Sequence, residues 1–275
     1  MSVRIAFQGE LGAYSHQACE QARPGCIPVP CTTFEDVVEM TRSGEADMGM
    51  LAVENSTYGR VADVHSLLPK SGLHIVDEAF VRVHVNLLGV KGATLADVRE
   101  AHGHVVILPQ CAGFLRAHGI KGKVSSDNAR AAREVAEAGD VTRAALASEL
   151  AARIYGLDVL ARHIEDHANN TTRFLLMSRE ADMARRAADM MTTFVFRVRN
   201  IPAALYKALG GFATNGVNMT KLESYMVDGS FTATEFYADV EGHPQDAGLR
   251  LALDELAYFT THLTILGVYP ADRKR

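Results

Sequence analysis

The sequence has no tryptophan, only 4 cysteines and no long uninterrupted apolar run. Four cysteines in 275 residues are too few for a disulfide scaffold, and no two of them form a CxxC pair. A bilayer-spanning helix needs roughly 20 apolar residues, whereas the most apolar stretch, residues 105–115, is short and contains Pro109 and Gln110. We therefore expect reduced thiols and no membrane helix. The cysteines are Cys19, Cys26, Cys31 and Cys111.

Positive charge is also in short supply, with 28 Lys and Arg against 33 Asp and Glu and a net charge of -5. A chain without a net basic field offers no broad surface for nucleic acid or an anionic membrane, so an anionic ligand needs a local cationic pocket. The first residues, MSVRIAFQGELGAYS, lack the apolar core and cleavage site of a secretory signal. We expect a cytoplasmic protein.

Hydrophobic residues make up 48% of the chain and charged residues 22%, close to the averages for folded globular proteins. Short apolar runs alternate with helical patterns, which indicates an α/β fold. The strands predicted in the first half cover residues 3–7, 47–53, 73–90, 105–108 and 144–147.

Capping signals predict where helices begin and end. Thr33 followed by Asp36 is typical of a helix start, and Gly44 lies where the C-cap belongs. Thr94 and Asp97 repeat the same spacing. Two further helices are predicted over residues 128–139 and 149–155.

The pattern changes near residue 180, where the charged, Ala-rich segment 178–189 indicates a linker or a short linking helix. The remainder predicts strands over 193–198, 217–225, 231–240 and 263–269, helices over 202–215 and 246–256, and a turn over 227–230. This is the βαββαβ order of ferredoxin-like modules. We expect a first domain over residues 1–180 and a second over 190–275.

Three polar segments are candidates for a site. Gly9–His16 follows the first predicted strand and would present a helix N-terminus, which favours anions. It lacks the third glycine of the dinucleotide fingerprint, and taken alone it is better explained as an ordinary strand-to-helix turn. Glu54, Asn55 and Ser56 stand at the end of another strand, where open α/β sheets bind ligands. Alternatively, these residues only cap and turn the chain.

The third segment, Asn169–Met177, runs from polar residues into an apolar strand. Arg173 is a candidate clamp for a carboxylate, because its planar guanidinium binds such a group bidentately. Strand alternation sends Thr172 and Arg173 to opposite faces, so both serve one site only if the backbone turns at the strand's entrance. The alternative is a surface arginine beside a strand-forming threonine.

No metal or nucleotide motif accompanies these segments. There are 11 histidines, but no HExxH pattern, no GxSxG elbow and no P-loop. We expect no metal and no cofactor.

Taken in order, four segments resemble prephenate dehydratase: Gly9–His16, Glu54–Ser56, Pro109–Cys111 and Asn170–Phe174. Lys221–Ser224, within the ferredoxin-like module, resembles an ACT domain. The resemblance covers nearly the whole chain.

This resemblance implies a two-lobed catalytic region like a type II periplasmic binding protein, with the active site between the lobes. The family converts prephenate to phenylpyruvate, water and carbon dioxide in phenylalanine biosynthesis. By resemblance, Thr172 donates a proton to the departing hydroxyl and Arg173 holds a substrate carboxylate. Glu54 is the rival acid, because burial without a neighbouring cation would raise its pKa and let it donate. The pocket residues implied are Ser15, Glu54, Asn55, Ser56, Gln110, Asn170 and Phe174.

ACT domains of this class bind phenylalanine, and here the match is incomplete. The chain reads Pro-Ala-Ala-Leu over 202–205 where the family has Pro-Gly-Ala-Leu, and Glu-Ser-Tyr-Met over 223–226 where Glu-Ser-Arg-Pro is usual. A methyl group at 203 hinders close backbone approach, and losing Arg-Pro changes charge and stiffness. We expect weakened or altered control by phenylalanine. The effector residues implied are Ala203, Ala204, Leu205, Glu223 and Ser224.

Some alternatives stay open on the sequence alone. Arogenate could replace prephenate as the substrate, and a non-catalytic sensor would fit the same architecture. Pairing of ACT modules at a sheet edge predicts a homodimer or a homotetramer.

Overall fold

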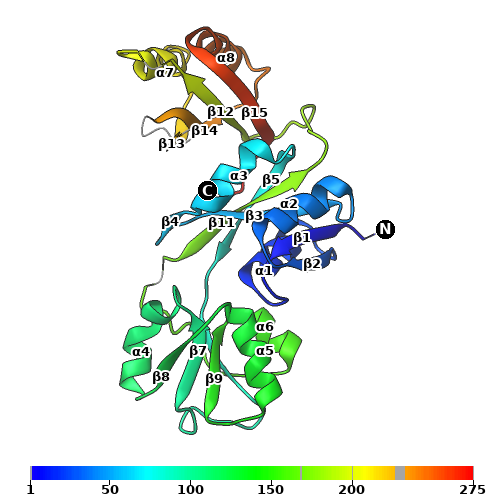
Figure 1. Cartoon of the computed structure of the whole chain (residues 1–275), viewed down its shortest axis with the longest axis vertical. Coiled ribbons are helices and arrows are strands. Elements are labelled where there is room, and N and C mark those ends of the chain that lie inside the picture. The colour runs from blue at the N-terminus through cyan, green and yellow to red at the C-terminus, as the bar shows by residue number, and fades with distance from the viewer. Residues whose placement is uncertain (1, 168, 200, 227–232, 275) are drawn as a thin grey trace. The chain divides into compact units, whose positions relative to one another are not determined.

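The computed structural model describes residues 2–167, 169–199, 201–226 and 233–274 (Figure 1). The chain divides into two compact units. Unit 1 comprises residues 1–64 and 79–174, and unit 2 comprises residues 65–78 and 175–275. Three elements pass from one unit to the other: α3 (Ala62–Leu67), β5 (His74–Arg82) and β11 (Thr171–Ser178).

Unit 1 begins with parallel strands joined by helices. β1 (Arg4–Gln8) pairs with β2 (Ile27–Cys31) on one side and β3 (Met48–Asn55) on the other. The connections are α1 (Tyr14–Ala22) and α2 (Phe34–Ser43), and the short β4 (Gly59–Arg60) folds back on the end of β3. α2 has the predicted capping box and ends at Gly44 in the left-handed conformation.

The second sheet of unit 1 has five strands in the order β10-β6-β9-β7-β8. η2 (Leu108–Cys111) and α4 (Ala112–Ala117) cover one face, while α5 (Asn128–Ala138) and α6 (Glu149–Tyr155) cover the other (Figure 1). Each face therefore has its own apolar core. The strands are β6 (Asn86–Gly89), β7 (Glu100–His104), β8 (Lys121–Ser125), β9 (Arg143–Ala147) and β10 (Asp158–Ala161).

Unit 2 has the predicted βαββαβ order, in an antiparallel arrangement β13-β14-β12-β15. Phenylalanines of the sheet and of α7 pack together with leucines of α8 in its core. β15 also pairs with β5, and η1 (Leu68–Lys70) precedes β5. The elements are β12 (Met190–Val198), α7 (Ala204–Thr214), β13 (Met219–Met226), β14 (Ala233–Glu241), α8 (Ala247–Phe259) and β15 (Thr260–Pro270).

Several local predictions are wrong. Residues 73–90 form two strands, β5 and β6, and β6 joins the second sheet. Residues 105–108 lead into η2 instead of forming a strand, since Pro109 fits the first turn of a helix. The Asp97 carboxylate accepts hydrogen bonds from the Thr94 N–H and hydroxyl, but only a turn forms there.

The remaining local predictions concern connections. Residues 179–189 contain no helix, so this segment is a linker without a linking helix. The turn predicted over 227–230 lies outside the described residues. Within the ranges that the structure describes, no helix is long and apolar enough to cross a membrane.

Candidate active site

The predicted site residues of unit 1 gather where β3 ends and β11 begins, on neighbouring strands. Strand alternation sorts them into two sets. Glu54 Oε1 lies 2.9 Å from Arg173 Nη1, whereas Asn55 Nδ2 lies 3.0 Å from Thr172 Oγ1. Because successive side chains point to opposite faces, the ion pair and the amide–hydroxyl pair lie on opposite faces.

Asn55 is held by hydrogen bonds on both sides of its amide. Its Oδ1 accepts from the backbone N–H groups of Thr57 and Tyr58, at 2.9 and 3.1 Å. Its Nδ2 donates to Asn170 Oδ1 at 2.6 Å and to Thr172 Oγ1 at 3.0 Å. The turn after β3 therefore fixes the direction in which the Asn55 amide points.

Asn170 continues this chain of hydrogen bonds toward the second sheet. Its side chain is buried, with 3% exposed, and its Nδ2 donates to Gln110 Oε1. Gln110, in η2, in turn donates to the Val106 carbonyl at 2.9 Å. We call Gln110, Asn170, Asn55 and Thr172 the amide network; it joins residues from three distant stretches of sequence.

Ser56 links the end of β3 to the start of β11 through hydrogen bonds. Its hydroxyl donates to the Asn169 carbonyl at 2.6 Å and accepts from the Thr171 N–H at 2.9 Å. Its own N–H donates to the Thr171 carbonyl. The Ser56 hydroxyl is thus engaged by backbone groups on both sides.

Arg173 has a different environment from Thr172. Its side chain is 2% exposed and forms an ion pair with Glu54, and its guanidinium lies 5.9 Å from the centre of the Phe80 ring. β11 is already a regular strand at Thr171, so the backbone turn that would bring Thr172 and Arg173 to one face is absent. Phe174 is buried in the core with 1% exposed.

The glycine turn after β1 is built for packing. Gly12 has φ 93°, and a Cβ placed on it would lie 2.7 Å from the Ala151 Cα of α6. Its N–H donates to His16 Nδ1 at 3.0 Å and its carbonyl accepts from the Ser148 hydroxyl. Burial lowers the pKa of His16, which keeps the ring neutral as an acceptor.

Ser15 is not joined to the amide network. It lies in the first turn of α1, half-buried, and in the described part of the chain its side chain makes no hydrogen bond. The neighbouring Tyr14 hydroxyl donates to the His84 carbonyl at 2.8 Å. Burial raises the pKa of Tyr14, so it acts as a neutral donor.

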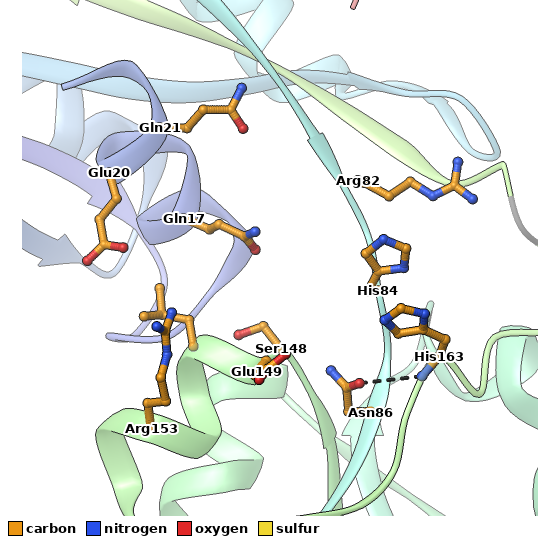
Figure 2. Close-up of a pocket in the computed structure, with 11 residues that line it drawn as sticks. Gln17, Glu20, Gln21, Arg82, His84, Asn86, Ser148, Glu149, Arg153 and His163 are labelled. Carbon is orange, nitrogen blue, oxygen red and sulfur yellow. Dashed lines mark hydrogen bonds between the residues drawn. The ribbon is translucent and has the colours of Figure 1, made fainter. Parts of the chain in front are cut away.

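A cavity of about 480 Å³ in unit 1 contains none of the predicted site residues (Figure 2). The imidazoles of His84 and His163 stack along one wall with ring centres 4.1 Å apart. Arg82, His84 and Asn86 line this cavity, and their spacing of two residues is the pattern expected for side chains on one face of a strand. This pattern was not used to predict a site.

The predicted effector residues lie in unit 2, on α7 and β13. Ala203 precedes α7 with φ 61°, a left-handed conformation, and Ala204 and Leu205 pack against the core. Glu223 and Ser224 lie on β13, and Glu223 Oε1 is 3.8 Å from Lys221 Nζ. The next residue along, Tyr225, places its hydroxyl 2.6 Å from His65 Nδ1.

Comparisons with known proteins agree with this architecture. Residues 5–182 match the family model of prephenate dehydratase. A bifunctional N-acyl-homoserine lactone acylase/prephenate dehydratase of Komagataeibacter europaeus is 53% identical, over 97% of this chain and 95% of that protein. A chloroplastic arogenate dehydratase/prephenate dehydratase of Arabidopsis thaliana is 38% identical, over 99% of this chain and 73% of that protein.

The solved prephenate dehydratase of Arthrobacter aurescens, in complex with L-Phe, matches with a TM-score of 0.89 and 30% identity, over 99% of this chain and 91% of that chain. Fold and site together define an α/β enzyme with a periplasmic-binding-protein-like catalytic region. The chain belongs to the prephenate dehydratase family, the carbon–oxygen lyases of phenylalanine biosynthesis.

Proposed function

We propose that the chain removes water and carbon dioxide from prephenate to form phenylpyruvate, with Thr172 delivering the proton. The observation that carries this assignment is the hydrogen bond from Asn55 Nδ2 to Thr172 Oγ1, 3.0 Å long. Because the threonine oxygen accepts here, its own hydrogen is available to an acceptor on the substrate.

The reaction asks little of the protein beyond positioning and one proton. The ring carboxylate leaves as carbon dioxide, its electron pair completes the aromatic ring, and the departing hydroxide takes a proton to become water. A threonine hydroxyl is a weak acid. The hydrogen bond from Asn55 stabilises negative charge on its oxygen during the transfer.

Glu54 is the rival proton donor, and its environment argues against that role. The guanidinium of Arg173 lies 2.9 Å from the Glu54 carboxylate and favours the ionised form, which has no proton to give. Arg173 carries its positive charge on the opposite face of β11 from the Asn55–Thr172 pair. The Arg173 side chain is 2% exposed and is paired with Glu54, which argues against direct binding of a substrate carboxylate by its guanidinium.

The test is a kinetic comparison of Thr172→Ala and Thr172→Ser with the unsubstituted enzyme, on prephenate and on arogenate. General acid catalysis contributes about 10²–10⁴-fold, so we expect kcat to fall by that factor in Thr172→Ala and to remain largely intact in Thr172→Ser. Product formation is followed by ultraviolet absorbance. Full activity in Thr172→Ala, together with inactivity of Glu54→Gln, would transfer the role to Glu54.

Regulation belongs to the second part of the chain in this proposal. Residues 1–180 form the catalytic domain, and residues 190–275 form an ACT domain that takes phenylalanine near residues 203–205 and 223–224. The βαββαβ order and the complex of the Arthrobacter aurescens enzyme with L-Phe support it.

β13 ends the strand order, and an edge strand of this kind favours a homodimer or homotetramer. The proposal places the enzyme in the cytoplasm.

A second candidate activity is hydrolysis of the amide bond of N-acyl-homoserine lactones. The Komagataeibacter europaeus relative carries both names and is 53% identical over nearly the full length of both chains. Water would add across the amide to release a fatty acid and homoserine lactone. Mass spectrometry of the purified protein incubated with such a lactone should detect both products, and recovery of intact lactone alone would remove this candidate.

A further inference from the structure

We propose that Asn170 is a positioning residue: it accepts a hydrogen bond from Asn55 and so orients that amide, whose other hydrogen points at the Thr172 oxygen and leaves the Thr172 hydroxyl to donate toward the substrate. The inference deepens the proposed function and rests on it. It assigns Asn170 a role that differs from lining the substrate pocket.

Backbone groups fix the polarity of the network at both ends. At one end, the N–H groups of Thr57 and Tyr58 can only donate, so the Asn55 atom facing them is its oxygen. At the other end, the Val106 carbonyl can only accept, so the Gln110 atom facing it is its nitrogen. Flipping the Asn55 amide would place its NH2 group against backbone N–H donors, and flipping the Gln110 amide would place its oxygen against a carbonyl oxygen.

Asn170 is the link that makes these two ends agree. Its oxygen accepts from Asn55 Nδ2, and its nitrogen donates to Gln110 Oε1. A flipped Asn170 would set its nitrogen against the Asn55 nitrogen and its oxygen against the Gln110 oxygen. The three amides therefore have one consistent arrangement, directed from Asn55 to Val106.

The hydrogens of Asn55 complete the argument. Its Nδ2 carries two hydrogens, and it has two acceptors, Asn170 Oδ1 and Thr172 Oγ1. The bond to Asn170 orients the amide so that its other hydrogen points at Thr172. Asn170, with 3% of its side chain exposed, offers almost no surface to a ligand.

Asn170→Asp tests this with a side chain of almost the same shape. An ionised aspartate accepts from Asn55 but cannot donate to Gln110, so the hydrogen bond to Gln110 Oε1 is lost and two acceptor oxygens face each other. A protonated aspartic acid can donate through its O–H and accept through its other oxygen, which restores the pattern. The unsubstituted network contains no ionisable side chain among its amides, so a new pH dependence would belong to the introduced carboxyl.

The matched control is Asn169→Asp, because Asn169 is the adjacent residue and its side chain is exposed. Initial rates on prephenate are measured for all three proteins from about pH 8 to about pH 5. We expect kcat of Asn170→Asp to fall about 10²-fold at neutral pH with KM little changed. Relative to the unsubstituted enzyme, its kcat should recover about 10-fold on acidification, while Asn169→Asp follows the unsubstituted enzyme throughout.

A raised KM with unchanged kcat in Asn170→Asp would make Asn170 a substrate-contacting residue and overturn the inference, as would a loss that acid does not reverse. If thermal melting shows that Asn170→Asp does not fold, Gln110→Glu puts the carboxyl at the next link, and the same recovery is then required. If the unsubstituted enzyme and Asn169→Asp both leave prephenate intact, the proposed function itself fails, and this inference fails with it.

Discussion

Ala203 shows how a single side chain can conflict with its backbone. Its φ of 61° and ψ of 14° lie in the left-handed region, which glycine enters freely and alanine does not. The Pro-Gly-Ala-Leu motif that this segment resembles has glycine at this position. The difference predicted to hinder a ligand is therefore also a source of backbone strain in the protein itself.

Ala203→Gly should stabilise unit 2. Removing the methyl group relieves about 1–2 kcal/mol of left-handed strain and costs about 0.5–1 kcal/mol of chain entropy, so we expect a net gain of about 1 kcal/mol in the free energy of unfolding. Denaturant unfolding measures it. The matched control is Ala204→Gly, one residue into α7, which should lose stability; a loss in both variants would contradict the strain argument.

Glu54, Asn55, Ser56, Gln110, Asn170, Thr172 and Arg173 are predicted from the sequence and are joined by hydrogen bonds or an ion pair, whereas Ser15 is not, and the partner of each residue could not be predicted. Strand alternation correctly predicts opposite faces for Thr172 and Arg173. It cannot predict that Arg173 pairs with Glu54, because that depends on the register between strands more than a hundred residues apart. The hydrogen bonds of the Ser56 hydroxyl with the backbone of residues 169 and 171 depend on the same register, so the sequence could not predict them either.

At the scale of elements, local signals predicted well and long-range ones did not. The capped helices α2, α5 and α6 begin and end close to the predicted residues, because caps and left-handed glycines act within one turn. Residues 73–90 are rich in apolar residues, yet they split into β5 and β6 since each half pairs with a different sheet. Which sheet a strand joins is decided by partners far along the chain.

Close approach between elements explains the glycine turn that the sequence left ambiguous. The turn before α1 approaches α6 at Gly12, where a methyl group would overlap Ala151. The Ser148 hydroxyl that caps α6 also donates to the Gly12 carbonyl. The same turn that resembles an anion-binding loop therefore serves to join two helices within unit 1.

At the scale of the whole molecule, a buried and a half-buried histidine make stability depend on pH. Burial lowers the pKa of His16, with the Glu20 carboxylate opposing it, and burial together with Arg143 lowers the pKa of His102. Below the ordinary histidine pKa of about 6.5, these two rings bind protons in the unfolded chain that they do not bind in the folded protein. Stability contributed by these rings is thus present at neutral pH and is lost as the pH falls.

His16→Gln isolates the contribution of His16, because the Gln oxygen can still accept from the Gly12 N–H while the titrating ring is gone. Melting temperatures are compared at about pH 7.5 and about pH 5.5 for the unsubstituted protein and the variant. We expect a smaller drop on acidification in His16→Gln, even if its stability at neutral pH is lower. His167→Gln removes an exposed histidine and should keep the full drop. An equal drop in all three proteins would show that protonation of His16 does not limit the stability of the fold, and the acid sensitivity would then have to come from His102 or from carboxylates that lose their ion pairs.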